Sequence, residues 1–142
     1  MMNIKPSLLE KYKSVYFFLN NEIAAIEFAI ITAWNPFSKP VSYNDNRQKN
    51  FHLECEILKQ NYEKLLVGDI NKEWTEESFA VEMSLDEAVE LGIKYEQNAI
   101  YYVRSDNVYL VSCIDEQKVE NEIALFSQRT KYHDSVIDLR RN

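Results

Sequence analysis

The stretch Phe28–Pro40, FAIITAWNPFSKP, places the end of a buried strand close to the start of a long helix. Its first half, Phe28–Ala33, is a short apolar run rich in β-branched residues, which is typical of a buried strand. Regular structure must stop after Trp34, because Pro36 has no backbone N–H and favours an extended conformation at Asn35. The stretch therefore predicts that an indole and a side-chain amide lie together at the rim of a sheet.

The composition limits the class of protein. The chain has 142 residues, 46% of them hydrophobic, which suits one globular domain. Its two glycines, Gly68 and Gly92, are too far apart for a glycine-rich phosphate loop. The two cysteines show no disulfide or metal-ligand spacing, which favours a reducing compartment. Because the sequence shows neither a signal peptide nor an apolar run of about 18 residues, we expect a cytoplasmic protein without a membrane segment.

The remaining patterns predict one α+β domain, a mainly antiparallel sheet with helices packed on it. Two clear strands, Ala99–Arg104 and Val108–Cys113, flank the turn residues 105–107 and form a predicted hairpin. Both strands carry apolar residues on both faces, as strands of a covered sheet do. A Ser-x-x-Glu capping box at Ser84 opens a helix. Weaker patterns add a helix at Pro6–Tyr12 and strands at Ser14–Leu19 and Ser78–Glu82.

Two longer helices are also predicted. The first begins at Ser42, a suitable N-cap, and runs to about Leu66. Its apolar residues recur at helical spacing, at Phe51, Cys55, Leu58, Tyr62 and Leu65. Leu53 and Ile57 fall opposite this stripe, so we expect the C-terminal tail or another molecule to cover them. In the tail, residues 114–142, a helix is predicted with Val119, Ile123 and Phe126 in register, followed by an apolar run at Ser135–Leu139 and a basic end.

Several short motifs resemble those of one known family. They are Thr32-Ala33-Trp34-Asn35-Pro36 with Ser38, Ser42 with Asp45-Asn46, Trp74-x-Glu76-x-Ser78-Phe79, and Gln97-Asn98-Ala99. Taken in this order, they resemble the motifs of an uncharacterised bacterial family, domain of unknown function 3293. The resemblance covers roughly Tyr12–Cys113 and leaves out the tail. It implies a small α+β domain and no assigned activity.

The polar and aromatic residues of these motifs form a candidate ligand-binding site. Its members are Trp34, Asn35, Asn46, Trp74, Glu76, Gln97 and Asn98. Amides donate and accept hydrogen bonds without ionising, and indoles offer stacking surfaces, so such a set suits recognition rather than proton transfer. The alternative is that these side chains tie loops to the backbone, as most side-chain hydrogen bonds do. The sequence leaves both interpretations open.

Familiar catalytic and metal-binding patterns are missing from the sequence. His52 and Cys55 have no further metal ligands at a suitable spacing. Glu76 and Glu77 are adjacent and, on a strand, would point to opposite faces, so they do not form an acid–base pair. We therefore expect no metal, no cofactor and no enzymatic activity.

The net charge of −7, the nine tyrosines and the lack of a catalytic motif favour a non-enzymatic module that binds a basic protein. Immunity proteins and antitoxins that neutralise a basic toxin, such as a nuclease, are of this kind. The charge also argues against direct binding to nucleic acid or to a membrane. The expected contact residues are Leu53, Ile57, Asp86, Glu87, Glu90, Asp115 and Glu116.

Two alternatives to protein binding remain. One is a structural subunit of an oligomer. The other is a small-molecule or nucleotide-binding domain with a site built on Trp34, Asn35, Glu76, Gln97 and Asn98. This second alternative requires that these five side chains converge on one concave pocket.

Overall fold

The computed structural model describes residues 2–115 and 119–132, which form eight strands and four helices. The strands are β1 (Tyr16–Leu19), β2 (Glu27–Ile31), β3 (Tyr62–Gly68), β4 (Thr75–Val81), β5 (Ala99–Arg104), β6 (Asn107–Ser112), β7 (Glu120–Leu125) and β8 (Thr130–Tyr132). The helices are α1 (Pro6–Lys13), α2 (Tyr43–Ile57), α3 (Leu85–Lys94) and α4 (Phe126–Arg129), with a 3-10 turn, η1, at Pro36–Ser38. One sheet contains all eight strands, in the order β7-β6-β5-β2-β4-β3-β1-β8, and only β1 and β8 pair in parallel. The predicted α+β class is confirmed.

The sheet curls so far that one short helix joins its two edge strands. β7 and β8 lie at opposite edges, and only α4 separates them in the chain. Phe126, at the start of α4, packs its ring 5.2 Å from that of Phe17 and 5.3 Å from that of Phe28. Arg129 Nη1, at the end of α4, donates hydrogen bonds to the carbonyls of Lys13 (3.0 Å) and Val15 (2.9 Å). α4 therefore covers the gap between the two edges of the sheet.

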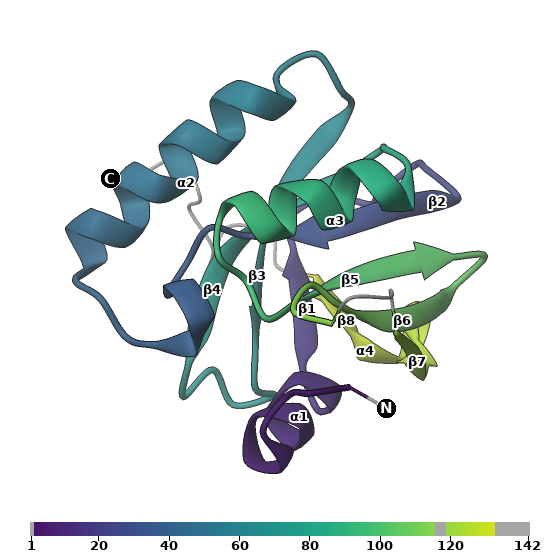
Figure 1. Cartoon of the computed structure of the whole chain (residues 1–142). Coiled ribbons are helices and arrows are strands. Elements are labelled where there is room, and N and C mark those ends of the chain that lie inside the picture. The colour runs from purple at the N-terminus through teal and green to yellow at the C-terminus, as the bar shows by residue number, and fades with distance from the viewer. Residues whose placement is uncertain (1, 116–118, 133–142) are drawn as a thin grey trace.

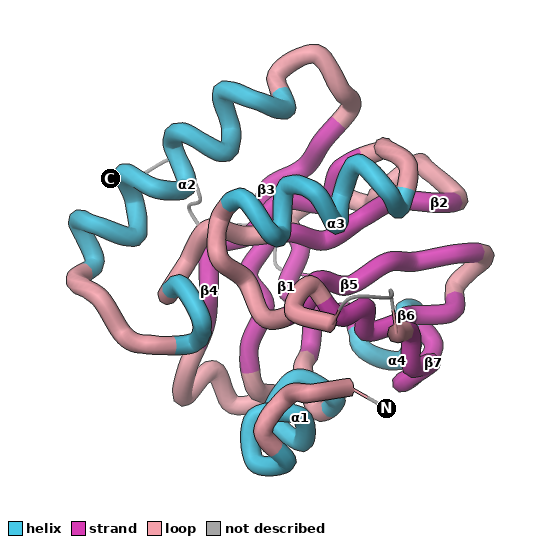
Figure 2. Tube along the Cα trace, viewed as in Figure 1, coloured by secondary structure: helices cyan, strands magenta, loops and turns pink. Residues whose placement is uncertain are grey.

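The curled sheet has an apolar core on each face. The inner core lies inside the curl and includes Phe17, Leu19, Phe28, Ile30, Leu65, Val67, Tyr101, Val103, Val108 and Leu110. The outer core lies between the sheet and α2 and α3, and includes Ala29, Ile31, Leu53, Ile57, Phe79, Val81, Ala88, Val89, Ile100 and Val111. Figures 1 and 2 show α2 and α3 against one side of the strands, with α1 apart from them at one end. Because successive strand residues face opposite sides, both cores draw on the same strands.

The prediction for the first long helix is wrong in its end and in its buried face. α2 ends at Ile57, and the predicted helical residues from Tyr62 onward form β3. Phe51 is 61% exposed, whereas Leu53 and Ile57 are fully buried against the sheet. The buried face also includes two asparagines, Asn46 and Asn50, so hydrophobic periodicity could not identify it. Leu53 and Ile57 therefore belong to the core and offer no surface to a partner.

The tail prediction is also wrong where the structure describes it. Residues 120–125 form the strand β7 on the otherwise open edge of β6, and α4 has four residues only. The predicted apolar positions Val119, Ile123 and Phe126 pack on the inner core, but a strand and a short turn place them there. The edge of β6 supplies backbone hydrogen-bond partners that a sequence pattern does not show. The predicted run Ser135–Leu139 and the basic end lie outside the described residues.

Three local predictions are confirmed. Ser84 and Glu87 form the capping box of α3, and the Ser42 side chain accepts a hydrogen bond from the Asp45 N–H. β5 and β6 form the expected hairpin, with Ser105 and Asp106 both at positive φ, 48° and 73°, as a tight two-residue turn requires.

Within residues 2–115 and 119–132, no helix is both long and apolar enough to cross a membrane.

Candidate functional site

A cavity of about 90 Å³ lies at the end of the curled sheet beside α1. Its wall is formed by α1, by β4, by the start of β5 and by the segment that follows β2. The lining residues include Lys11, Asn35, Trp74, Glu76, Gln97 and Tyr101. The volume is several times the roughly 10–15 Å³ that hold one water molecule. Four of the seven predicted ligand-binding residues, Asn35, Trp74, Glu76 and Gln97, therefore line the same cavity.

Glu76 is the only acidic side chain in the described wall of this cavity. It projects inward from β4, whereas Glu77 lines a different cavity on the outer side, as the alternation of a strand predicts. Burial raises the pKa of Glu76 to about 7, against the opposing effects of the Lys11 charge and a hydrogen bond from Asn35. The described ion pairs all lie elsewhere, so Glu76 has none within 4.0 Å among these residues. The sequence reasoning did not foresee a group that exchanges a proton near neutral pH.

Asn46 orients Asn35 toward Glu76. The extended conformation expected for Asn35 before Pro36 is wrong: Asn35 adopts the left-handed conformation (φ 46°), which asparagine tolerates better than most residues. Its side-chain oxygen accepts hydrogen bonds from Asn46 Nδ2 (2.9 Å) and from the Val41 N–H (3.1 Å), while its N–H donates to Asn46 Oδ1 (2.7 Å). Because Asn46 and Val41 both donate to the Asn35 side-chain oxygen, the side-chain nitrogen of Asn35 points the other way and can donate to Glu76. Asn46 is thus a positioning residue and is not part of the cavity wall.

The loop after Asn35 is held in a strained conformation. Phe37 and Ser38 also have positive φ, 52° and 61°, which costs a non-glycine residue on the order of 1–3 kcal/mol. The Phe37 N–H donates to the Glu96 carbonyl (2.6 Å), and Asn98 Nδ2 donates to Ser38 Oγ (3.3 Å) and Tyr12 Oη (3.2 Å). These bonds fix one wall of the cavity, because Tyr12 and Ser38 both line it.

The other predicted amides and the first indole brace the fold. Gln97 Nε2 donates to the carbonyls of Trp34 (3.2 Å) and Tyr95 (3.1 Å). Trp34 is 8% exposed and packs edge-on against Tyr43, with ring centroids 5.8 Å apart, outside the cavity. Asn98 acts on the wall through Tyr12 and Ser38, as described above. Of the five residues of the small-molecule hypothesis, Asn35, Glu76 and Gln97 line the cavity, and Trp34 and Asn98 do not. Trp34, Asn98 and the amide nitrogen of Gln97 instead brace the fold, as the alternative interpretation expected.

Sequence reasoning missed one buried amide that holds the site in place. Asn50 on α2 is 6% exposed, and its Oδ1 accepts a hydrogen bond from the Ala33 N–H (2.8 Å). Its Nδ2 donates to the Glu77 carbonyl (2.7 Å), so it connects the segment after β2 to β4. Asn46 and Asn50 are four residues apart, so both amides lie on one face of the helix. This spacing was the sequence pattern that could have identified Asn50.

Three further cavity residues were also missed. Tyr101 is almost fully buried, and its Oη donates to the Tyr12 carbonyl (2.7 Å). Lys11 Nζ lies 4.3 Å from the centroid of the Trp74 ring, so the helix α1 supplies a cation at the rim. Tyr101 and Tyr12 looked like ordinary apolar positions of a strand and a helix, and no sequence signal set them apart.

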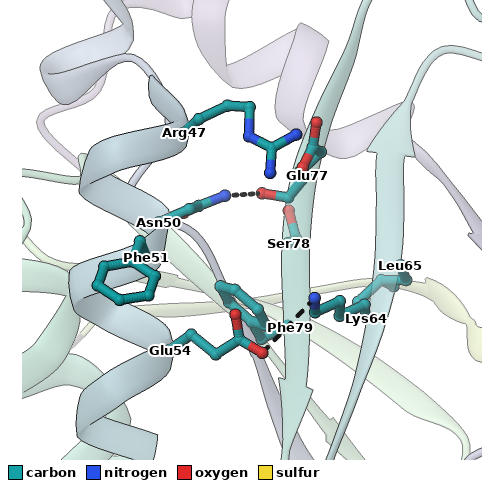
Figure 3. A pocket seen from close by; sticks show the side chains of 9 residues that line it. All are labelled: Arg47, Asn50, Phe51, Glu54, Lys64, Leu65, Glu77, Ser78 and Phe79. Atoms are coloured by element: carbon teal, nitrogen blue, oxygen red, sulfur yellow. Dashed lines mark hydrogen bonds and ion pairs between the residues drawn. The ribbon is translucent and has the colours of Figure 1, made fainter. Parts of the chain in front are cut away.

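A second cavity, of about 110 Å³, lies outside the sheet between α2 and strands β3 and β4. Figure 3 shows Arg47, Asn50 and Glu54 projecting toward it from the helix and Lys64 and Glu77 from the strands. Lys64 Nζ lies 3.6 Å from Glu54 Oε2, and the Tyr43 hydroxyl accepts from Arg47 Nη1 (3.1 Å) and donates to Glu77 Oε2 (3.3 Å). Each charged side chain of this described wall thus has a hydrogen-bond or ion-pair partner from the chain itself, which makes the cavity a weaker candidate than the one around Glu76.

The predicted protein-binding residues do not form one surface. Glu87 and Glu90 are exposed on α3, as is Asp86, and the first turn of that helix favours acidic side chains. Asp115 lies elsewhere and accepts hydrogen bonds from the Asn3 N–H (3.1 Å) and from Ser112 Oγ. Glu116 lies outside the described residues. The apolar part of the predicted surface is lost, because Leu53 and Ile57 are buried.

Comparison with known proteins supports the motif assignment. Residues 31–100 match the model of a family described as "Protein of unknown function (DUF3293)". The matched segment runs from the end of β2 into β5 and contains every motif on which the resemblance was based. No match was found among curated proteins or among solved structures. The predicted resemblance is confirmed, over a shorter segment than the expected Tyr12–Cys113.

Proposed function

We propose that this chain, whose residues 31–100 match the DUF3293 model, binds a small polar molecule in the cavity beside α1, with Glu76 as the residue that anchors it. The observation that carries the proposal is the grouping of Asn35, Trp74 and Glu76 around one small cavity. All three belong to motifs in the segment that matches the family. A cytoplasmic location is part of the proposal, and the free thiols of Cys55 and Cys113 support it.

The energetics of Glu76 support a binding role. Burying a charged carboxylate without a full ion pair is unfavourable, so such groups are found mainly where another molecule or a proton completes them. Glu76 is desolvated enough for its pKa to rise to about 7. If its purpose were structural, glutamine would serve as well without the electrostatic penalty.

The rigidity of the surroundings supports the same role. Asn46 sets the orientation of Asn35, and Asn50 ties the preceding segment to β4. Positioning of this kind keeps a binding group within a narrow range of geometry before the ligand arrives. The amides of Asn46 and Asn50 thus fix the positions of the segments that carry the cavity residues.

The test is a screen of small polar metabolites by thermal shift, repeated on Glu76→Gln and on Glu77→Gln as a matched control. The two substitutions change the same charge on adjacent residues of β4, but only Glu76 lines the cavity. We expect ligands that raise the melting temperature of the wild type and of Glu77→Gln to lose their effect on Glu76→Gln. Equal effects on all three proteins would show that binding does not use this cavity.

Binding of a basic protein is a second proposal, supported by the net charge of −7 and the exposed Asp86, Glu87 and Glu90 on α3. Its partner would be a basic toxin, such as a nuclease, encoded beside the gene. Cells that produce the chain should then survive expression of that toxin. The triple variant Asp86→Asn, Glu87→Gln, Glu90→Gln should protect cells less than the wild type does. Full protection by the triple variant would remove α3 as the contact surface.

A further inference from the structure

We infer that the ligand of the cavity beside α1 carries an alkylammonium group, which lies against Trp74 and donates a hydrogen bond to Glu76. This inference rests on the proposed small-molecule function and adds the chemical class of the ligand. It follows from the hydrogen-bonding capacity left in the cavity, from the aromatic wall, and from the position of Lys11.

Three donors of the cavity wall already have acceptors. Tyr101 Oη donates to the Tyr12 carbonyl (2.7 Å), and Gln97 Nε2 donates to two carbonyls (3.2 and 3.1 Å). The Asn35 amide is directed to Glu76. A carboxylate accepts about four hydrogen bonds, so Glu76 retains unused capacity. A ligand that complements the Glu76 carboxylate must therefore bring a donor.

The aromatic residues of the wall suit a cation. Trp74, Tyr12 and Tyr101 line the cavity together with the carboxylate. The face of an indole or phenol ring attracts cations, and aromatic rings beside a carboxylate are a general way to bind an ammonium group. Lys11 shows this attraction within the chain itself, because its own alkylammonium group lies 4.3 Å from the Trp74 centroid.

Lys11 does not complete the site. Its Nζ makes no ion pair with Glu76 within 4.0 Å, although its charge is close enough to lower the Glu76 pKa. Lys11 is exposed, so it occupies the outer rim and leaves the inner part of the cavity to a ligand. A bound ammonium group would sit nearer to the carboxylate and would compete with Lys11 for the ring.

Two other ligand classes fit less well. An anion would meet the Glu76 carboxylate in a partly desolvated cavity whose described wall offers one basic residue, Lys11. A metal ion would need several ligating side chains, and the described residues contain no cluster of three or more His, Cys, Asp or Glu suited to one. One carboxylate with aromatic neighbours matches a monovalent organic cation better than either.

The experiment is an NMR titration of the full ¹⁵N-labelled chain with methylammonium and trimethylammonium chloride at pH 8. tert-Butanol serves as the neutral probe, sodium acetate as the anionic probe, and sodium chloride as the ionic-strength control. The indole N–H of Trp74 reports on the cavity, and that of Trp34, which lies outside it, is the internal reference. The proteins compared are the wild type, Glu76→Gln, Glu77→Gln and Lys11→Met, with Lys13→Met as the control for Lys11.

We expect both ammonium probes to shift the Trp74 signal in the wild type and in Glu77→Gln, with little change at Trp34. Affinity should fall at least about tenfold in Glu76→Gln, since a charge-assisted hydrogen bond is lost. Lys11→Met should bind more tightly than Lys13→Met, because the competing cation is gone. The unperturbed spectrum of each free variant establishes that it is folded.

The pH profile gives an independent readout. The titratable groups that face Glu76 are Lys11 and Tyr12 from α1 and Tyr101 from β5. Burial raises the pKa of Tyr101 well above its ordinary value, so it stays protonated in this range. With the pKa of Glu76 near 7, affinity of the wild type should drop about tenfold from pH 8 to pH 6, and that of Glu76→Gln should not change with pH.

Three outcomes would overturn the inference. If acetate or tert-butanol shifts Trp74 through Glu76 and the ammonium probes do not, the ligand class is wrong but the ligand-binding function stands. If the ammonium probes bind Glu76→Gln as tightly as the wild type, the assigned contact is wrong. If no probe of any charge shifts Trp74, and the metabolite screen finds no Glu76-dependent ligand, the proposed function fails as well.

Discussion

Glu76 and Glu77 are neighbours on β4, yet they belong to two different environments. Glu76 faces the inside of the curled sheet, where burial raises its pKa to about 7. Glu77 faces outward, where its carboxylate accepts a hydrogen bond from Tyr43 Oη (3.3 Å). The chemistry of a carboxylate in this protein therefore depends on which face of the strand carries it, and a shift of one residue in register would exchange the two roles.

The two faces also differ in how they are covered. Helices α2 and α3 cover the outer face, and their polar groups, such as Asn50, are bonded to the backbone. The inner face is covered by its own strands and by α4, and at the end beside α1 it leaves a cavity with a carboxylate in its wall. Substitutions on the outer face should therefore cost stability, whereas those at the inner cavity should change protonation and binding.

The largest expected effect is on the outer face. Asn50→Ala leaves the buried Ala33 N–H without a partner, at about 1–3 kcal/mol, and removes one of two hydrogen bonds to the Glu77 carbonyl, at about 1 kcal/mol, since Thr32 Oγ1 also donates to that carbonyl (2.7 Å). We expect the free energy of unfolding, measured by urea denaturation, to fall by up to about 4 kcal/mol. Gln48→Ala, an exposed position of the same helix, should change it by less than about 0.5 kcal/mol. A loss below about 1 kcal/mol in Asn50→Ala would mean that water replaces the amide.

Glu76→Gln should raise the free energy of unfolding, and the size of this increase should depend on pH. In the unfolded chain the carboxyl has its ordinary pKa of 4.5, and in the folded protein the pKa is about 7. The folded state therefore holds the proton more tightly, and the stability of the wild type falls as pH rises from about 4.5 to about 7. At roughly 1.4 kcal/mol per pKa unit, the full loss is about 3 kcal/mol.

Because glutamine has no such loss, Glu76→Gln should be more stable than the wild type by about 3 kcal/mol at pH 8 and nearly equal to it at pH 4.5. Urea denaturation at the two pH values measures the difference. Glu77→Gln is the matched control, and we expect it to stay within about 0.5 kcal/mol of the wild type. A destabilised Glu76→Gln at pH 8 would assign Glu76 a structural role.

A third effect tests how closely α3 approaches the outer face. A Cβ added at Gly92 would lie 2.5 Å from Cys113 Sγ and 2.9 Å from Ile100 Cγ2, so the helix or those side chains must move. We expect Gly92→Ala to lower the free energy of unfolding by about 2 kcal/mol, in the range typical of overpacked cores. The exposed Glu90 on α3 gives the helix-propensity difference between alanine and glycine separately, because Glu90→Ala and Glu90→Gly should differ there by about 1 kcal/mol. A neutral Gly92→Ala would mean that the layer adapts.

The smallest effect concerns protonation at the inner cavity. Lys11 lowers the pKa of Glu76 by its charge, so Lys11→Met should raise that pKa further above 7. The ¹³C chemical shift of the Glu76 carboxyl, followed against pH, measures the change. Lys13→Met should leave the titration where it is. An unchanged pKa in Lys11→Met would show that solvent screens the Lys11 charge.

Local sequence signals predicted much of the fold. The hairpin of β5 and β6, the capping box at Ser84 and the N-cap at Ser42 were predicted because each is set by residues close in sequence. The end of α2 and the strand β7 were not, because tertiary pairing decides both. β3 needs β4 and β1 as partners, and β7 needs the free edge of β6.

The site was predictable as a list of residues but not as an arrangement. The motifs pointed to Asn35, Trp74 and Glu76, and these do share a cavity. Nothing in the sequence separated them from Trp34 and Asn98, which brace the fold, since the same residue types serve both purposes. The raised pKa of Glu76 comes from burial, a property of the folded molecule alone.

The segment β7-α4-β8 has a consequence for folding during synthesis. These residues finish both margins of the sheet, and among the described residues they are made last. A growing chain that has reached residue 115 would expose unpaired backbone on β6 and on β1 together, a state prone to misassembly between molecules. A purified chain truncated after residue 115 should therefore aggregate, whereas a chain that extends through residue 132 should not.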